Sequence, residues 1–214
     1  MDDTAVHIAV GLCLGLPICH PHSCRHGGCQ VTVFATHGLS CTRSEGRHLC
    51  HSSVNSLVQR ALSAAGVPSC LEPSSLARSD GMRPDGVNMV PWSSGKPLVW
   101  DATCPDTLAP SHESIAVRGP RSVAKAAEMK KWAKYDALHH SYSFAPVAIE
   151  TLGAIGPMSL KFLRQLRTQI REQSGEESFS YLMQQISVVV WRANAVSVMG
   201  SLPESAHPDN FFFL

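Results

Sequence analysis

A β-hairpin predicted over residues 83–103 constrains the fold of this chain more than any other stretch. Two apolar runs flank the turn segment 93–95, which is rich in serine and glycine. A three-residue turn would place Asp85 opposite Thr103, with Asp101 diagonally across from Asp85 on the same face of the strand pair. The sequence therefore predicts that the carboxylates of Asp85 and Asp101 converge.

Two convergent carboxylates suit a hard divalent cation. Mg²⁺ prefers oxygen ligands and usually takes one or two carboxylates, with water and substrate phosphates completing its coordination. Asp85 and Asp101 therefore have the chemistry of a metal site for phosphodiester cleavage. The alternative is a pair of solvated aspartates flanking a hairpin, because Asp is common at strand ends and in turns.

Residues 19–51 form a segment rich in cysteine and histidine, with little hydrophobic periodicity. Such a composition indicates that a metal ion, more than an apolar core, holds the segment. Cys24, Cys29, His37 and Cys41 have the spacing of a closed tetrahedral site for a structural zinc ion. The alternative is a cysteine-rich segment with incidental histidines. Nearby residues that could replace one of these ligands are Cys19, His22, His26, Cys50 and His51.

The composition excludes several classes of protein. Lysine and arginine number 18 against 17 acidic residues, so there is no global basic field and any nucleic-acid surface must be local. The N-terminus has no signal-peptide pattern, and the cysteines are therefore expected to be reduced or metal-bound. No apolar stretch reaches the roughly 20 residues of a membrane span. The sequence thus predicts a soluble intracellular protein.

The chain is predicted to contain a zinc-knuckle segment followed by a larger core. The segment covers residues 1–51, the core 52–200, and a disordered tail 201–214. The expected fold is α+β or α/β, with a short central sheet flanked by helices. A helix capped by Ser52 or Ser53 should open the core. Further helices are expected over 121–138, 158–173 and 178–199, and a further strand over 142–152.

Lys131 is the distinctive residue of the helix predicted over 121–138. Every third or fourth position from Ala124 to Leu138 follows the spacing of a buried stripe, and Lys131 is the charged residue on it. A buried ammonium requires an anion, and the nearest candidates are the two aspartates of the hairpin. Lys134, one turn away, is the reserve candidate, whereas Lys130 can reach solvent. The alternative is that Lys131 extends along apolar surface to water.

Two blocks of sequence together resemble a known family. The first comprises residues 24–41 and 46–48, and the second comprises 83–85 and 100–103. They resemble the restriction-like endonuclease domain that follows the reverse transcriptase in site-specific non-LTR retrotransposons, and in open reading frames derived from them. The resemblance runs from about Cys19 to about Met199 and includes 72–73, 131–135, 144–146 and 150–153.

This resemblance implies a restriction-endonuclease-like core of the PD-(D/E)xK type that nicks DNA with Mg²⁺, while the zinc knuckle helps to hold the target. Asp85 would be the aspartate of the PD element and Asp101 the second acidic residue, both on Mg²⁺. Glu72 would be a third oxygen ligand or an orienting group. Lys131 would position the attacking water and counter charge at the phosphate.

Thr103 departs from the family pattern, because a standard PD-(D/E)xK enzyme has a lysine two residues after its second acid. The lysine would then come from the following helix, as Lys131 or Lys134. The start of the knuckle also differs, which makes His26 a rival to Cys29. The expected partners are DNA and the RNA of the parent element, at a nuclear location. The alternative function is a catalytically inactive, zinc-containing nucleic-acid-binding module of a decayed retroelement.

Overall fold

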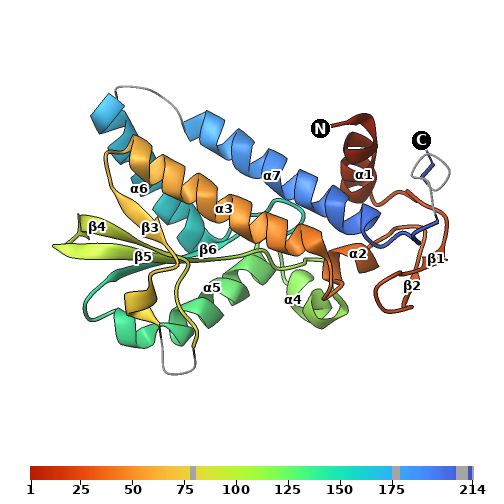
Figure 1. Cartoon of the computed structure of the whole chain (residues 1–214), viewed down its shortest axis with the longest axis horizontal. Coiled ribbons are helices and arrows are strands. Elements are labelled where there is room, and N and C mark those ends of the chain that lie inside the picture. The colour runs from red at the N-terminus through yellow and green to blue at the C-terminus, as the bar shows by residue number, and fades with distance from the viewer. Residues whose placement is uncertain (78–80, 175–178, 206–211, 214) are drawn as a thin grey trace.

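A computed structural model describes residues 1–77, 81–174, 179–205 and 212–213 (Figure 1). The longer helices are α1 (Asp3–Leu14), α3 (Glu45–Ala64), α5 (Ser122–Lys134), α6 (Pro157–Ser174) and α7 (Phe179–Met199). The short helical elements are α2 (His37–Ser40), η1 (Ser74–Leu76), η2 (Pro110–His112), α4 (Glu113–Ala116) and η3 (Asp136–Leu138). The strands are β1 (His22–Ser23), β2 (Gln30–Val31), β3 (Ser69–Leu71), β4 (Gly86–Ser93), β5 (Lys96–Thr103) and β6 (Ser143–Ala148).

A four-stranded mixed sheet in the order β3-β4-β5-β6 forms the centre of the structure. The first two pairings are antiparallel, whereas β5 and β6 are parallel. Parallel neighbours need a crossover connection, and the segment containing α5 supplies it. Helices α3, α6 and α7 lie on one face of the sheet and α5 on the other (Figure 1). The predicted α+β fold with a short central sheet flanked by helices is therefore confirmed at this level.

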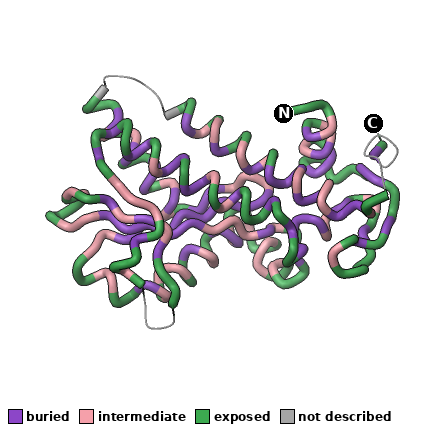
Figure 2. The backbone as a smooth tube through the Cα atoms, in the orientation of Figure 1, coloured by how far each residue is buried: buried purple, intermediate pink, exposed green. Residues whose placement is uncertain are grey.

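The larger apolar core lies between the sheet and the helices α3, α6 and α7. Residues 98–102 of β5 are all buried, because helices cover both faces of the sheet at this strand (Figure 2). Trp100 has no exposed surface, and its indole N–H donates to the amide oxygen of Asn55 on α3 at 3.1 Å.

Among the described residues, no helix has both the length and the apolar character needed to cross a membrane.

The hairpin forms, but its predicted three-residue turn is wrong. Ser93 pairs with Lys96, so the turn consists of residues 94–95 alone, both at positive φ (50° and 76°). Two-residue turns of this kind match the right-handed twist of the flanking strands. Irregularities farther along the hairpin shift the register, and Gly86 pairs with Trp100.

Asp85 consequently does not face Thr103. It directly precedes β4, and its backbone N–H donates to the carbonyl oxygen of Trp100 at 3.0 Å. Pro91 and Pro97 face each other inside the hairpin. Because neither proline can donate a ladder hydrogen bond, this part of the pairing is weak, and it lies where the register shifts.

Helix α3 begins at Glu45, so the predicted start at Ser52 or Ser53 is wrong and the predicted domain boundary falls inside the helix. Its first turn packs closely on α7. A Cβ atom on Gly46 would lie 2.2 Å from the carbonyl oxygen of Ala193, which only glycine avoids. Tertiary packing therefore extends the helix beyond the capping signal in the sequence.

A second apolar cluster holds the N-terminal segment together, which the sequence did not predict. Val31 and Leu39 are buried beside Ile8 of α1 and beside Ala195 and Val198 of α7. The cysteine- and histidine-rich segment therefore shares a core with the end of α7, and a metal ion is not its sole source of order.

The described part of the tail also packs against this cluster. Leu202 and Phe212 are buried, and Phe212 forms a β-bridge with Cys19. These residues are thus ordered by apolar contacts, which the prediction of a disordered tail did not anticipate. Positions 206–211 and 214 lie outside the described residues.

Glu128 on α5 is a fully buried acid that joins two helices. Its carboxylate accepts hydrogen bonds from the backbone N–H groups of Met158 and Ser159, at 3.1 and 2.7 Å, and from the Ser159 hydroxyl at 2.6 Å. These N–H groups belong to the first turn of α6, where a negative charge is favourable. A Cβ atom on Gly156 would lie 2.1 Å from the carboxylate, so glycine makes room for this cap.

We expect Glu128→Ala to lower the free energy of unfolding by about 2–3 kcal/mol, because it leaves buried N–H groups at the start of α6 without an acceptor. Urea unfolding followed by circular dichroism measures the change. Glu113→Ala, which removes an exposed acid from α4, is the control and should leave the midpoint nearly unchanged. Equal midpoints for the two variants would contradict the capping role.

Candidate functional site

Two aspartates and a lysine meet where β4 begins and β5 ends. The side chain of Asp101 on β5 is only 3% exposed, and the ammonium of Lys131 on α5 forms an ion pair with its Oδ1 atom. Asp85 is 16% exposed, and its Oδ2 atom accepts a hydrogen bond from the backbone N–H of Ala102 at 2.6 Å. The contact between Lys131 and an aspartate of the hairpin is the one that helical periodicity predicts.

His51 on α3 also belongs to this group, although the sequence indicated it only as a substitute zinc ligand. Its Nε2 atom lies 3.0 Å from Asp85 Oδ2. Asn55, one helical turn later, binds the indole of Trp100. The signal in the sequence is a polar pair at i and i+4 on the inner side of α3, and it becomes visible only if the helix begins before Ser52.

The pKa values of Asp85 and His51 are shifted by the neighbouring groups of this cluster. Burial alone would raise the pKa of Asp85, but the hydrogen bond and charge of His51, with hydrogen bonds from Ala102 and Asn55, lower it below the ordinary value. The hydrogen bond to Asp85 raises the pKa of His51 despite its burial, and the charges of Asp85 and Asp101 act in the same direction, while Lys131 opposes them. Both carboxylates thus contribute to the raised pKa of His51.

Neither Glu72 nor the reserve candidate Lys134 takes part in the ion pair between Lys131 and Asp101. Glu72 is 68% exposed and forms an ion pair with Arg83. Within the described ranges, no group with ligand atoms within 4.8 Å of one another contains both aspartates and Glu72. The ammonium of Lys134 lies 4.7 Å from the centre of the Tyr135 ring, so it is Lys131 that makes the ion pair with Asp101.

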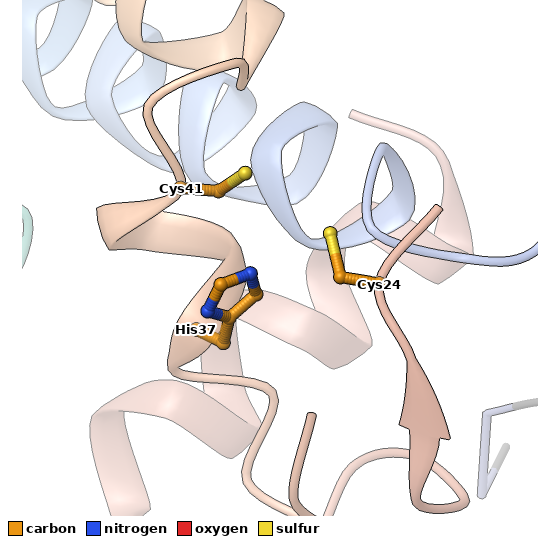
Figure 3. Close-up of side chains that lie close together, drawn as sticks. All are labelled: Cys24, His37 and Cys41. Atoms are coloured by element: carbon orange, nitrogen blue, oxygen red, sulfur yellow. The ribbon is translucent and has the colours of Figure 1, made fainter. Parts of the chain in front are cut away.

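A second candidate site lies in the N-terminal segment, where Cys24, His37 and Cys41 come together (Figure 3). Their ligand atoms all lie within 4.8 Å of one another, and both cysteines are buried. The Nε2 atom of His37 is buried and has no hydrogen-bond partner. Two thiols and an imidazole at this separation could hold a metal ion such as zinc.

The two thiols also influence each other in a way that favours a cation. Burial raises the pKa of Cys41, and the neighbouring sulfur atoms of Cys24 and Cys29 raise it further, while a backbone hydrogen bond involving Arg43 opposes them. A bound dication would stabilise the thiolates that burial and mutual repulsion disfavour.

Cys29, the predicted fourth ligand, is not a member of this cluster. It is exposed, and its carbonyl oxygen accepts from the backbone N–H of Cys24 at 2.8 Å across the turn between β1 and β2. Its effect on the pKa of Cys41 places its sulfur in the same neighbourhood. Cys29 is therefore near the cluster, and its thiol lies farther out than the three grouped ligands.

Several substitute ligands have other contacts. Burial raises the pKa of Cys19 to about 11, and its thiol donates to the carbonyl oxygen of Thr32. The imidazole nitrogens of His22 lie 2.8 Å from the His20 carbonyl oxygen and 3.3 Å from the Ser201 hydroxyl. Three further candidates also have partners: His26 accepts from Arg25, Cys50 contacts Cys104, and His51 pairs with Asp85.

No protein-family model matches the chain, and no curated protein matches it either. These comparisons identify no restriction-like endonuclease domain, so a functional proposal depends on the geometry of the two sites.

We expect protein purified without added metal to contain one zinc ion per chain. Cys24→Ser and Cys41→Ser should each lose it, because each removes a buried sulfur ligand. Cys13→Ser is the matched control, since Cys13 is an exposed thiol on α1. Elemental analysis and chelator competition measure content and affinity, and weaker zinc retention in Cys29→Ser would identify Cys29 as the fourth ligand. A wild-type protein without metal would contradict the prediction.

Proposed function

We propose that the chain is a Mg²⁺-dependent endonuclease that nicks DNA by phosphodiester hydrolysis, and that it derives from the reverse-transcriptase polyprotein of a retrotransposon. The observation that carries the proposal is the buried carboxylate of Asp101 in contact with the ammonium of Lys131, beside the carboxylate of Asp85. An acid pair with a lysine from the following helix is also what the resemblance to restriction-like endonucleases implies.

The donor set of this site fits Mg²⁺. Asp85 and Asp101 offer carboxylate oxygen ligands, and the buried Oδ1 atom of Asp101 has the Lys131 ammonium as its charged partner. When bound there, Mg²⁺ would supply Lewis-acid stabilisation of the phosphate and a lowered pKa for water. The backbone N–H of Ala102 and the imidazole of His51 hold Asp85 in place for this task.

A cleft of about 300 Å³ is lined by His51 and Lys131, the basic partners of the two carboxylates, and suits a nucleic-acid phosphate. Arg47 and His48 also contribute to its lining, and none of the described residues that line it is acidic. Lys131 can therefore contact a bound phosphate and orient the attacking water from α5. Thr103, at the position where the standard motif has lysine, also lines this cleft.

The second candidate is a zinc-containing nucleic-acid-binding module without catalysis. One observation favours it: each carboxylate already has a basic side chain as its partner, His51 for Asp85 and Lys131 for Asp101. A structural cluster neutralises its buried charges in the same way. For both candidates we propose DNA as the partner, RNA of the parent element as a further one, and a nuclear location.

Nicking of supercoiled plasmid tests the proposal. We expect the wild-type protein to nick with Mg²⁺ and to stop when EDTA is added. Lys131→Ala and Asp101→Asn should each reduce the rate by roughly 100-fold or more, because the first removes a positive charge at the reacting phosphate and the second removes a charged ligand of the metal ion. Lys130→Ala, which removes an exposed lysine next to Lys131, is the matched control and should nick at nearly the wild-type rate.

DNA binding, measured by fluorescence anisotropy, separates the two candidates. Under the endonuclease proposal, Lys131→Ala should bind DNA nearly as well as the wild type while nicking is lost. Equal nicking by the wild type and Lys131→Ala would contradict the role of this lysine. Tight binding by a wild-type protein that does not nick would favour the non-catalytic module.

A further inference from the structure

Cys50 and Cys104 bring two thiols together beside the acidic cluster. Cys50 lies on α3 and Cys104 directly follows β5, and their sulfur atoms are 2.7 Å apart. A disulfide bond would require these atoms to approach by less than about 1 Å. Both residues are held by the larger core, since Cys50 belongs to it and Cys104 packs against it.

Cys104 is the more accessible of the two residues. Cys50 is 5% exposed, whereas Cys104 is half-buried and lines the cleft of about 300 Å³ described above. That cleft also presents Arg47, His48 and Lys131, and within the described part of the chain no acidic side chain lines it. A small anionic reagent is therefore favoured at Cys104 by charge as well as by access.

Cys104 is mostly protonated, because its pKa is raised, and its neighbours have opposing effects on that pKa. The contact with Cys50 raises the pKa of Cys104, burial raises it further, and the positive charge of Arg47 opposes both. Exchange at Cys104 is therefore expected to be slower than at a fully exposed thiol, although the second thiol lies within contact distance for the closing step.

We propose that Cys50 and Cys104 form a reversible disulfide by exchange with an anionic low-molecular-weight disulfide, of which glutathione disulfide is the example. The Cys104 thiolate attacks one sulfur of glutathione disulfide, forming a mixed disulfide and releasing one glutathione thiolate, which takes up a proton. Cys50 then loses its proton and attacks the Cys104 sulfur, closing the protein disulfide and releasing the second glutathione. Two protein thiols are oxidised and one glutathione disulfide is reduced to two thiols.

Such a bond would connect α3, which carries His51, to the end of β5, which carries Asp101. It would close a loop between residues 50 and 104 and thereby restrict the unfolded chain. We therefore expect the oxidised protein to unfold at a higher temperature, by roughly 5 °C or more. This inference does not depend on whether the chain cuts DNA.

Peptide mapping of the whole folded chain tests the proposal. The protein is incubated with glutathione disulfide, its remaining thiols are alkylated, and it is digested with trypsin without reductant. Residues 48–60 and 79–118 form peptides that contain Cys50 and Cys104 as their single cysteines. We expect mass spectrometry to find these two peptides joined, and dithiothreitol to separate them. Cys13, exposed on α1, should carry glutathione and serves as the internal control for the reagent.

Two single substitutions test the order of the steps. Cys50→Ser should trap one glutathione on Cys104, because the second thiol is missing. Cys104→Ser should leave Cys50 unmodified, because Cys50 is buried. The rise in unfolding temperature should be absent from both variants. Unjoined peptides in a wild-type protein whose Cys13 carries glutathione would overturn the proposal, and modification of Cys50 in Cys104→Ser would overturn the assigned order.

Discussion

The packing of α7 against α3 is the contact on which both candidate sites depend. The two backbones approach closely here, since a Cβ atom on Gly46 would lie 2.7 Å from the backbone nitrogen of Ser197. The buried Ser44 hydroxyl donates to Ser197 Oγ at 2.8 Å. On α2, Gly38 also lies against α7, because its Cβ atom would lie 2.8 Å from the Ser197 carbonyl oxygen. The adjacent His37 is thus positioned by α7, while α3 carries His51 to the acidic cluster.

The acidic cluster is stabilised by contributions from both faces of the sheet. Asp101 is almost completely buried, and an unpaired carboxylate there would carry a large desolvation cost. Lys131 offsets that cost from the α5 side, while His51 partners Asp85 from the α3 side. The basic partners of the two carboxylates thus approach from opposite faces of the sheet, and His51 and Lys131 both line a cleft to which no acidic side chain of the described residues contributes.

Features of the sequence that are local in origin predicted the structure well. Helical periodicity predicts α5, α6 and α7 within a few residues, and a single charge on an apolar stripe predicts the contact of Lys131 with an aspartate. The errors in the start of α3 and in the cysteine-rich segment arise from contacts between residues that are far apart in the sequence. The start of α3 depends on contact between Gly46 and α7, and the core of the cysteine-rich segment depends on α7 as well. The membership of His51 in the cluster follows from the true start of α3.

The charged residues of α5 show which contacts helical periodicity can predict and which it cannot. Lys131 and Glu128 lie three residues apart on one helix, and tertiary contacts bury Glu128 fully and Lys131 in part. The stripe pattern identifies Lys131 because its neighbours at helical spacing are apolar. It misses Glu128, whose partners are backbone N–H groups of α6 that no periodicity reveals. Because Glu128 fixes α5 to α6 and Lys131 fixes α5 to β5, the position of the lysine that faces the cleft depends on the acid one turn before it.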